Sequence, residues 1–446
     1  MWQSLRQKVQ NKHFLSLAGN GVMSVLGMLT MILLYRALSV ADIGLWVFFL
    51  STYLFVDTFR SGFITTAFIK FYAGSDERRA TEVVGSAWIV ALSITAILVL
   101  LNSLAFLFID YIENPAMVLF VRWFSLAFIV SLPTFVASCV VQGEQRFDRL
   151  LAIRFATQGS YILIITILVV IKWTSLDTIL YAYLGSLLFS SLFCLLTGWA
   201  RPASFRNRTA KGVRELYDFG KYSVGTTLSS NLFGTSNTFI INFMLGPEAL
   251  AIYNLGQRLM ELIEIPLRSF AATGMPELAA WYNQGQRQRV IQTMKKYIGL
   301  ITFALVPVCL VAVLLADVAI AIIGGSKYVE TEAANIMRIF MLFALLYPLD
   351  RFQALTLDVI HQPRINFIKV LIMLVASVSA SFLGVYLTES IYGVAIGGIV
   401  PILIGVGISK WALNRYCGFR YVDIYKTGFM EGKALLANYL PGFSAK

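Results

Sequence analysis

The stretch FLSLAGNGVMSVLGMLTMILL, residues 14–34, decides the fold, because it is a long apolar run without a single charged residue. A helix rises about 1.5 Å per residue, so ~20 apolar residues cross a hydrocarbon core of ~30 Å. The run is too long for the apolar core of a cleavable signal peptide, which has about 7–15 residues. We therefore expect it to remain in the protein as the first transmembrane helix.

The rest of the chain has the same apolar character. Of its 446 residues, 58% are hydrophobic and 13% are charged, whereas a soluble domain is about a quarter charged. The net charge of +12 could indicate nucleic-acid binding, but basic residues between membrane spans also orient a protein in a bilayer. The four cysteines have no CxxC spacing, which argues against a disulfide or zinc framework. We expect one membrane domain and no nucleic-acid partner.

Twelve apolar stretches are long enough to span a membrane. We place them at residues 14–37, 41–71, 83–109, 116–142, 150–172, 177–199, 219–245, 249–279, 297–317, 334–359, 365–388 and 391–413. Basic residues concentrate in alternate connections: 6–12, 78–79, 146–149, 201–221, 287–296, 364–369 and the tail. By the positive-inside rule these segments, and therefore both termini, are cytoplasmic. A missed span would break the alternation, so the alternation supports the count of twelve.

The longest connection divides the spans into two groups of six. We predict an N-terminal lobe at 1–200, a cytoplasmic linker at 201–218, a C-terminal lobe at 219–413 and a basic cytoplasmic tail at 414–446. The linker combines a proline with a basic run, which is typical of a solvated segment. The tail mixes aromatic and basic residues, a composition suited to an anionic membrane surface, and a frayed end is the equal alternative.

The two lobes share a sequence repeat. LSVADIGLW at 38–46, between the first and second spans, matches LGPEALAIY at 245–253, between the seventh and eighth. Because six is an even number, both lobes enter the membrane from the same face, as in transporters built from parallel repeats. Two like lobes imply a central cavity, and we expect transport by alternating access.

Four short segments carry a family resemblance: 38–46, LGPEALAIYNLG at 245–256, VQGEQRF at 141–147 and HQPRINF at 361–367. The chain resembles the polysaccharide-repeat-unit (O-antigen/exopolysaccharide) flippases of the multidrug/oligosaccharidyl-lipid/polysaccharide exporter superfamily over residues 14–411. The resemblance implies an all-α, MATE-like membrane fold and translocation of an undecaprenyl-diphosphate-linked oligosaccharide across the bacterial inner membrane. It also implies a role in O-antigen, capsule or exopolysaccharide assembly, with membrane lipids, a polysaccharide polymerase and other assembly proteins as partners.

Other classes of protein fit the sequence less well. Cation-coupled multidrug exporters of the same superfamily are the alternative. Their cavities resemble acidic, aromatic chambers for cationic drugs, whereas this chain has more basic than acidic groups within its spans. Lipid II flippases usually carry fourteen spans, and we find no extra pair. We do not expect an enzyme, because the sequence has no HExxH, DxD or GxSxG pattern in a useful context and no P-loop. It also lacks a large periplasmic loop. A channel would require a filter motif or rings of pore-lining residues.

Ionisable side chains within the predicted spans are the main functional signal, because each costs roughly 2.5–3.5 kcal/mol at the membrane centre and normally faces a cavity or a partner. At the repeat offset Asp57 aligns with Glu264, and Arg60 and Arg268 follow one turn later. Arginine stays protonated and presents a planar fork to phosphate oxygens. We hypothesise that Arg60 and Arg268 face each other across the cavity and bind a diphosphate or an acidic sugar. The alternative is that each pairs locally with its acidic neighbour.

The predicted sites extend to several further residues. On the eighth span Arg258, Glu261 and Glu264 are spaced three apart on one face, which cannot face lipid. If a Na⁺ or H⁺ gradient drives the cycle, Glu261 or Glu264 is the expected carrier; we expect no other cofactor and no metal. In the tenth span, Pro348 predicts a bend. The candidates are Arg60, Arg122, Arg258, Arg268 and Arg351 for substrate binding, and Asp57, Glu261 and Glu264 for ion coupling.

Overall fold

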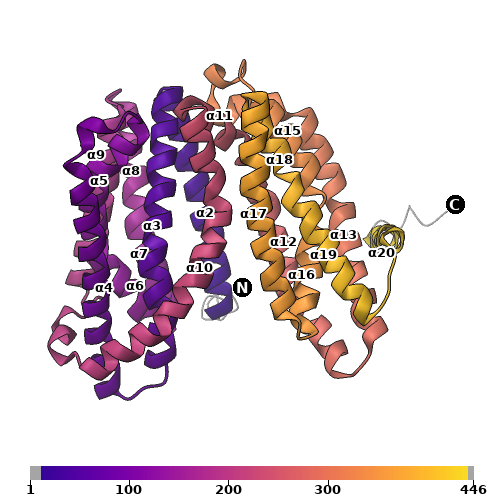
Figure 1. Ribbon diagram of the computed structural model, residues 1–446, viewed down its shortest axis with the longest axis horizontal. Helices are drawn as coiled ribbons and strands as arrows, with labels where there is room; N and C mark the ends of the chain where they lie inside the picture. Colours follow the sequence, from indigo (N-terminus) through magenta and orange to yellow (C-terminus); the bar gives the residue numbers. More distant parts are fainter. Residues whose placement is uncertain (1–11, 440–446) are drawn as a thin grey trace. The chain divides into compact units, whose positions relative to one another are not determined.

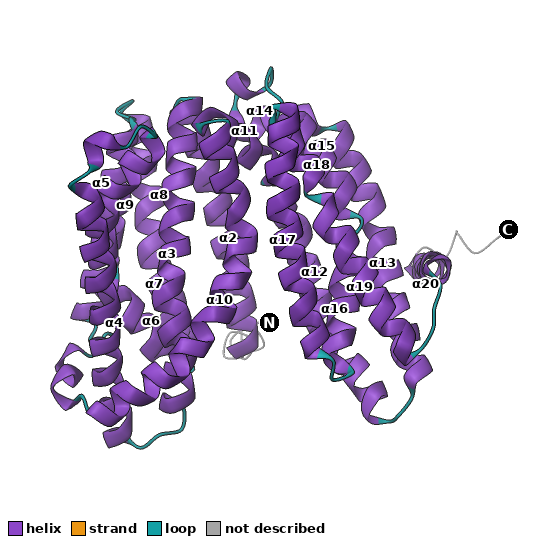
Figure 2. Ribbon diagram, viewed as in Figure 1, coloured by secondary structure: helices purple, strands orange, loops and turns teal. Residues whose placement is uncertain are grey.

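The computed structural model describes residues 12–439, and within this range the chain is almost entirely helical and has no β-strand (Figure 2). Arg6 and Lys8, which the sequence assigns to the cytoplasmic side, lie outside the described residues. Contacts between residues divide the chain into two units, Met1–Phe243 and Met244–Lys446. The predicted all-α membrane fold is confirmed.

The first unit contains the helices drawn from indigo to magenta in Figure 1. They are α2 (Lys12–Ala37), α3 (Val40–Tyr72), α4 (Glu77–Phe106), α5 (Pro115–Val130), α6 (Leu132–Gly143), α7 (Phe147–Arg154), α8 (Ser160–Val170), α9 (Leu176–Leu196) and α10 (Ala210–Met244). A π-helical segment at Phe155–Gly159 joins α7 to α8, and short 3-10 turns lie at Ile109–Tyr111 and Pro202–Asn207.

The second unit continues the chain through the rose, orange and yellow part of the colour scale (Figure 1). Its helices are α11 (Pro247–Gln257), α12 (Met260–Asn283), α13 (Arg287–Leu314), α14 (Ala316–Gly324), α15 (Ala333–Ala344), α16 (Tyr347–Val359), α17 (Pro363–Thr388), α18 (Ile391–Gly397), α19 (Ile399–Tyr416) and α20 (Tyr421–Tyr439). A 3-10 turn occupies Ser326–Tyr328.

The two segments of the sequence repeat begin equivalent helices in different ways. In the first unit the Ser39 hydroxyl caps α3 by accepting a hydrogen bond of 3.1 Å from the Asp42 amide. In the second, Gly246 has a φ of +88°, which favours glycine, and Pro247 occupies the first turn of α11. Both devices satisfy or remove amide groups that a helix N-terminus leaves unpaired.

Each of the twelve predicted spans falls on one helix or on two consecutive helices. In the part of the chain that the structure describes, seven helices are long and apolar enough to cross a membrane, and two bent pairs raise the number to nine. The other predicted spans coincide with α2, whose described apolar part is short, and with the more polar α10 and α11–α12. The helix pattern is therefore consistent with twelve spans in a multi-pass membrane protein.

The two bent pairs occupy equivalent places in the two halves of the sequence, the fourth and the tenth predicted spans. Helices α5 and α6 meet at 47°, and α15 and α16 meet at 42°. Pro133 and Pro348 lie in the first turn after each bend. Proline has no amide hydrogen and cannot bond to the preceding turn, so the bend predicted at Pro348 is confirmed.

The linker after the sixth predicted span is packed rather than freely solvated. Gly85 on α4 lets the chain approach so closely that a Cβ there would lie 2.2 Å from the Ser204 carbonyl oxygen. The Trp88 indole nitrogen donates a 2.9 Å hydrogen bond to the Ala200 carbonyl. Hydrophilic composition suggested a solvated segment, but it could not reveal the matching glycine on α4.

Helix α10 groups by its contacts with the first unit. Its Gly220 lies against the backbone of Phe63, where a Cβ would come within 2.4 Å of the Phe63 carbonyl oxygen. The rings of Tyr217 and Phe63 are 5.5 Å apart. The predicted division into two lobes of six spans would place α10 in the second lobe. That division stays a prediction from the sequence repeat.

Candidate functional site

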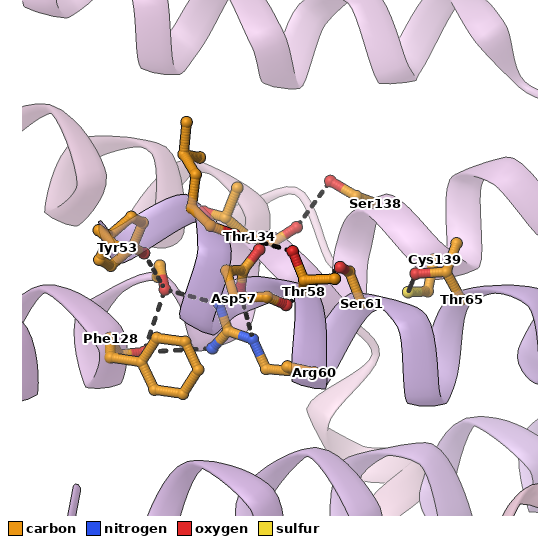
Figure 3. Close-up of polar contacts among 12 residues, drawn as sticks. Tyr53, Asp57, Thr58, Arg60, Ser61, Thr65, Phe128, Thr134, Ser138 and Cys139 are labelled. Atoms are coloured by element: carbon orange, nitrogen blue, oxygen red, sulfur yellow. Dashed lines mark hydrogen bonds and ion pairs between the residues drawn. The ribbon is translucent and has the colours of Figure 1, made fainter. Parts of the chain in front are cut away.

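A charged cluster surrounds Arg60 in the first unit (Figure 3). Its guanidinium donates to Asp57 Oδ1 from Nε at 3.0 Å and from Nη2 at 2.6 Å. Nη1 donates to the Phe128 carbonyl at 3.2 Å, and Nη2 also donates to the Ser131 hydroxyl at 2.9 Å. The guanidinium carbon lies 4.1 Å from the centre of the Phe128 ring. Arg60 is thus paired, hydrogen-bonded and covered by an aromatic face, which compensates a buried charge.

The bend between α5 and α6 explains why an arginine is needed at this place. A bent membrane helix exposes backbone carbonyls that require other donors. The Ser131 hydroxyl lies at the bend, donates to the Phe128 carbonyl at 3.0 Å and accepts from the Tyr53 hydroxyl at 3.0 Å. The Val130 carbonyl accepts a hydrogen bond of 2.5 Å from Ser191 on α9. The cluster therefore holds α3 against the bent pair.

The burial of Arg60 differs from the predicted exposure to a cavity. Its side chain is 2% exposed, whereas that of Asp57 is 25% exposed. The structure shows the local ion pair that the sequence left as the alternative. The physical reason is the carbonyl of Phe128, which lies on another helix and draws the guanidinium inward. In this arrangement Asp57 is the more accessible member of the pair.

Helix α12 and the break before it carry two further ion pairs in the second unit. Arg258, in the break between α11 and α12, donates to Glu261 at 2.7 Å. Arg268 donates to Glu264 at 2.6 Å. The Arg268 side chain is 73% exposed and that of Glu264 is 40% exposed. The two aligned arginines, Arg60 and Arg268, therefore both pair locally but have opposite exposure.

The two remaining arginine candidates lie on bent helix pairs. Arg122 is on α5 and Arg351 is on α16, and both side chains are exposed. Among the described residues neither arginine forms an ion pair. Arg122 is not among the hydrogen-bond partners of the cluster around Arg60, although both residues belong to the first unit.

A buried ion pair that the sequence analysis did not identify joins α16 to α17. Lys369 donates to Asp350 at 3.1 Å, and its side chain is 2% exposed. The sequence analysis includes Lys369 in the basic connection 364–369, although Lys369 lies four residues inside the span predicted to begin at 365. Gly405 on α19 makes room for the pair, since a Cβ there would lie 2.9 Å from Asp350 Oδ1. Because Lys369 fits the alternating pattern of basic connections, the sequence analysis did not identify it as an inward-facing lysine.

Several of the basic residues used to orient the chain are engaged in ion pairs at one end of the first unit. Arg201 and Arg149 both pair with Glu144, at 2.5 Å and 3.3 Å. Arg79 pairs with Glu215 on α10. These pairs connect the linker and α10 to the first helices, a role that charge counting in the sequence could not show.

The described residues contain no group of three or more histidine, cysteine, aspartate or glutamate side chains that could hold a metal ion. Several charged groups instead form arginine–carboxylate or lysine–carboxylate ion pairs. Such pairs can exchange partners with an anionic ligand or with a small cation, because a guanidinium binds phosphate as well as carboxylate.

The fold is that of a multi-pass membrane protein whose predicted spans carry several ion pairs. The sequence profile described as polysaccharide biosynthesis protein matches residues 33–333. The chain belongs to the polysaccharide biosynthesis protein family, which confirms the resemblance to polysaccharide flippases seen in the sequence. A comparison with curated proteins finds no significant sequence match.

Solved structures share the fold at low sequence identity. The lipid II flippase MurJ, in an inward closed conformation, has a TM-score of 0.71 at 13% identity, covering 96% of this chain and 93% of MurJ. An inward-facing multidrug resistance MATE family transporter of the MOP superfamily has a TM-score of 0.70 at 15% identity, covering 88% of this chain and 95% of the transporter. A MOP superfamily transporter from Pyrococcus furiosus, described as having a binding pocket of reverse polarity, gives 0.55 at 16% identity, with coverages of 91% and 96%.

Proposed function

We propose that this chain is a flippase that moves an undecaprenyl-diphosphate-linked oligosaccharide across the bacterial inner membrane by alternating access. The glycan would serve O-antigen, capsule or exopolysaccharide assembly, and the chain itself would perform no catalysis. The observation that carries the proposal is membership of the polysaccharide biosynthesis protein family. The pattern of basic connections supports cytoplasmic termini.

Exposed arginines support an anionic headgroup as the bound species. Arg268, Arg122 and Arg351 all lie within predicted spans and have exposed side chains. A guanidinium can bind two phosphate oxygens at once, which gives a diphosphate both affinity and orientation. We assign Arg268 the main role, with Arg258, Arg122 and Arg351 in support, and we give Arg60 the role of positioning Asp57 rather than touching the substrate.

The pairing of Arg268 with Glu264 also offers a route to ion coupling. When a diphosphate attracts the Arg268 guanidinium, the Glu264 carboxylate loses its partner and becomes free to accept H⁺ or Na⁺. The same exchange applies to Arg258 and Glu261, while Asp57 stays paired with the buried Arg60. In a Glu261→Gln, Glu264→Gln variant we expect transport to lose its dependence on pH or sodium. Unchanged dependence would remove both glutamates from the coupling.

The proposal is tested in cells that need this chain to display a surface glycan. Arg268→Ala should lower glycan display at least about tenfold, which corresponds to a loss of ~1.4 kcal/mol in a charge-assisted contact. The matched control is Arg214→Ala, because Arg214 also pairs with a carboxylate one turn away, Asp218 at 3.7 Å, but lies in the predicted linker. Equal glycan display by both variants at equal membrane abundance would contradict the assignment.

The alternative function is cation-coupled multidrug export, which the shared fold allows. It predicts that the chain confers resistance to cationic compounds and that glycan display is independent of it. The same cells distinguish the two functions, because only the flippase function leads to lipid-linked glycan accumulating when the chain is depleted.

A further inference from the structure

Helix α20 crosses α13 instead of running alongside it. Figure 1 views α20 almost along its axis, whereas α13, α17 and α19 run within the plane of the picture. The crossing is made by two glycines in backbone contact, since a Cβ on Gly299 would lie 2.5 Å from the Gly428 Cα. Ile424, one turn before Gly428, is fully buried at the same contact. The crossing angle means that α20 lies roughly in the membrane plane if α13 spans the bilayer.

The crossing lies at the level where α13 enters the membrane. Lys295 and Lys296 are the last charged residues of α13 before its apolar part, which begins at residue 297. Gly299 is therefore within about one turn of the membrane boundary. The start of α20 is held against α19 by the Tyr421 hydroxyl, which donates to the Val406 carbonyl at 3.3 Å.

The two sides of α20 have opposite chemistry, and contacts with α13 fix their direction. Glu431 lies 3.8 Å from the Lys296 ammonium, on the side toward the charged start of α13. The Phe429 ring lies 6.0 Å from the Phe303 ring, on the side toward the apolar part. The acidic side of α20 is thus turned toward the charged start of α13 and its aromatic side toward the apolar part, an arrangement typical of a helix that lies in a membrane interface.

The outward surface of α20 combines apolar and basic side chains. Val422, Tyr425, Phe429 and Met430 are exposed, and so are Lys426 and Lys433. On a helical projection the two lysines fall next to Val422 and Phe429 and away from Gly428. Lysine can extend from such a position to lipid phosphates while its methylenes stay in the apolar layer. The exposed apolar residues of α13, such as Phe303 and Val306, continue the same surface toward the membrane core.

We propose that α20 lies flat in the cytoplasmic leaflet and binds anionic lipid headgroups through Lys426 and Lys433. A lipid surface is favoured over a protein partner because the apolar side is continuous with the lipid-facing surface of α13 and because the acidic side is turned toward the charged start of α13. An anionic leaflet attracts basic residues at its surface by about 1 kcal/mol each. The proposal does not depend on which substrate the chain transports.

A first experiment locates the two sides of α20 in the full-length protein in native membranes. A photoreactive amino acid is placed at Phe429 on the aromatic side or at Asp423 on the acidic side, about 120° apart around the helix. We expect lipid adducts from position 429 and few from position 423. Adducts from position 429 to another protein chain, or equal lipid adducts from both positions, would overturn the proposal.

A second experiment measures the lipid preference itself. The protein is reconstituted in phosphatidylcholine vesicles with or without phosphatidylglycerol, and a spin-labelled phosphatidylglycerol reports the lipid held at the protein surface. Lys426→Gln with Lys433→Gln should lower the preference for the anionic lipid about fivefold per lysine. The control is Lys211→Gln with Lys221→Gln, two exposed lysines near the predicted linker. An unchanged preference in the Lys426/Lys433 variant, or the same loss in the control, would overturn the proposal.

Discussion

Arg60 and Arg268 occupy aligned positions in the sequence repeat, yet their surroundings impose different roles. The Arg60 guanidinium makes four hydrogen bonds in the protein interior. The Arg268 guanidinium makes one bond to a partly exposed carboxylate. A buried ion pair broken on one side costs several kcal/mol, whereas an exposed pair contributes about 0–1 kcal/mol.

This difference predicts that Arg60→Ala reduces the free energy of unfolding by roughly 3 kcal/mol, since it leaves the Asp57 carboxylate without its partner and removes one of the two side-chain donors to the Phe128 carbonyl. Arg268→Ala should change it by less than about 1 kcal/mol while lowering transport. Thermal denaturation of the purified variants in detergent measures the effect. Similar losses of stability in both variants would show that the burial of Arg60 has no energetic consequence.

The Asp350–Lys369 pair leads to a second prediction of the same kind. Asp350→Asn leaves the buried Lys369 ammonium without its carboxylate and should lower thermal stability strongly. Adding Lys369→Met removes the charge and should restore most of the loss, because an apolar replacement of a buried pair is often neutral. If the double variant is no more stable than Asp350→Asn, the ion pair is not the cause of the loss.

For single residues, the sequence could predict ion pairs between neighbours on one helix, but not whether these pairs are buried. The spacing of Asp57 and Arg60, and of Glu264 and Arg268, already allowed an ion pair within one helix. Whether such a pair is buried depends on the neighbouring helices. Arg60 is buried because the bend between α5 and α6 offers it the Phe128 carbonyl and the Ser131 hydroxyl. Lys369 shows the reverse case, because its position near a span end suggested water and its partner on α16 was not visible in the sequence.

Among the helices, apolar length predicted the spans well, because a bilayer allows few alternatives to a long apolar helix. The bend at Pro348 was predictable because a proline interrupts the hydrogen bonds of its own helix. Packing between elements was not predictable: the linker against α4, α10 against α3 and α20 against α13 all depend on glycines whose partners lie far away in the sequence. Gly85, Gly220 and Gly299 have no local feature that sets them apart.

Gly85→Ala should therefore detach the linker, because its methyl group would collide with the backbone at Ser204 and Arg208. We expect a loss of stability and faster protease cleavage within 201–209. The matched control is Gly185→Ala on α9, which would meet nothing within 4 Å and should gain up to about 1 kcal/mol from helix propensity. Equal protease resistance in the two variants would contradict the packed linker.

For the whole molecule, family membership and fold agree on a multi-pass membrane protein of polysaccharide biosynthesis. The proposed transport of an anionic lipid-linked substrate rests on the chemistry of exposed arginines. The repeat in the sequence is matched by bent helix pairs of 47° and 42° in equivalent places, one in each unit. Composition, the positive-inside pattern and the family resemblance were enough to predict this class. They could not identify which charged side chains are accessible, because that depends on the packing of each unit.

Translocation of a lipid-linked glycan by the purified chain tests the central claim most directly. Full-length protein is reconstituted in vesicles that contain an undecaprenyl-diphosphate-linked oligosaccharide, and a sugar-modifying enzyme added outside reports how much glycan crosses the bilayer. The account predicts protein-dependent crossing that Arg268→Ala reduces and Arg214→Ala does not. Vesicles that show no glycan crossing, yet accumulate a cationic drug in response to an ion gradient, would contradict it.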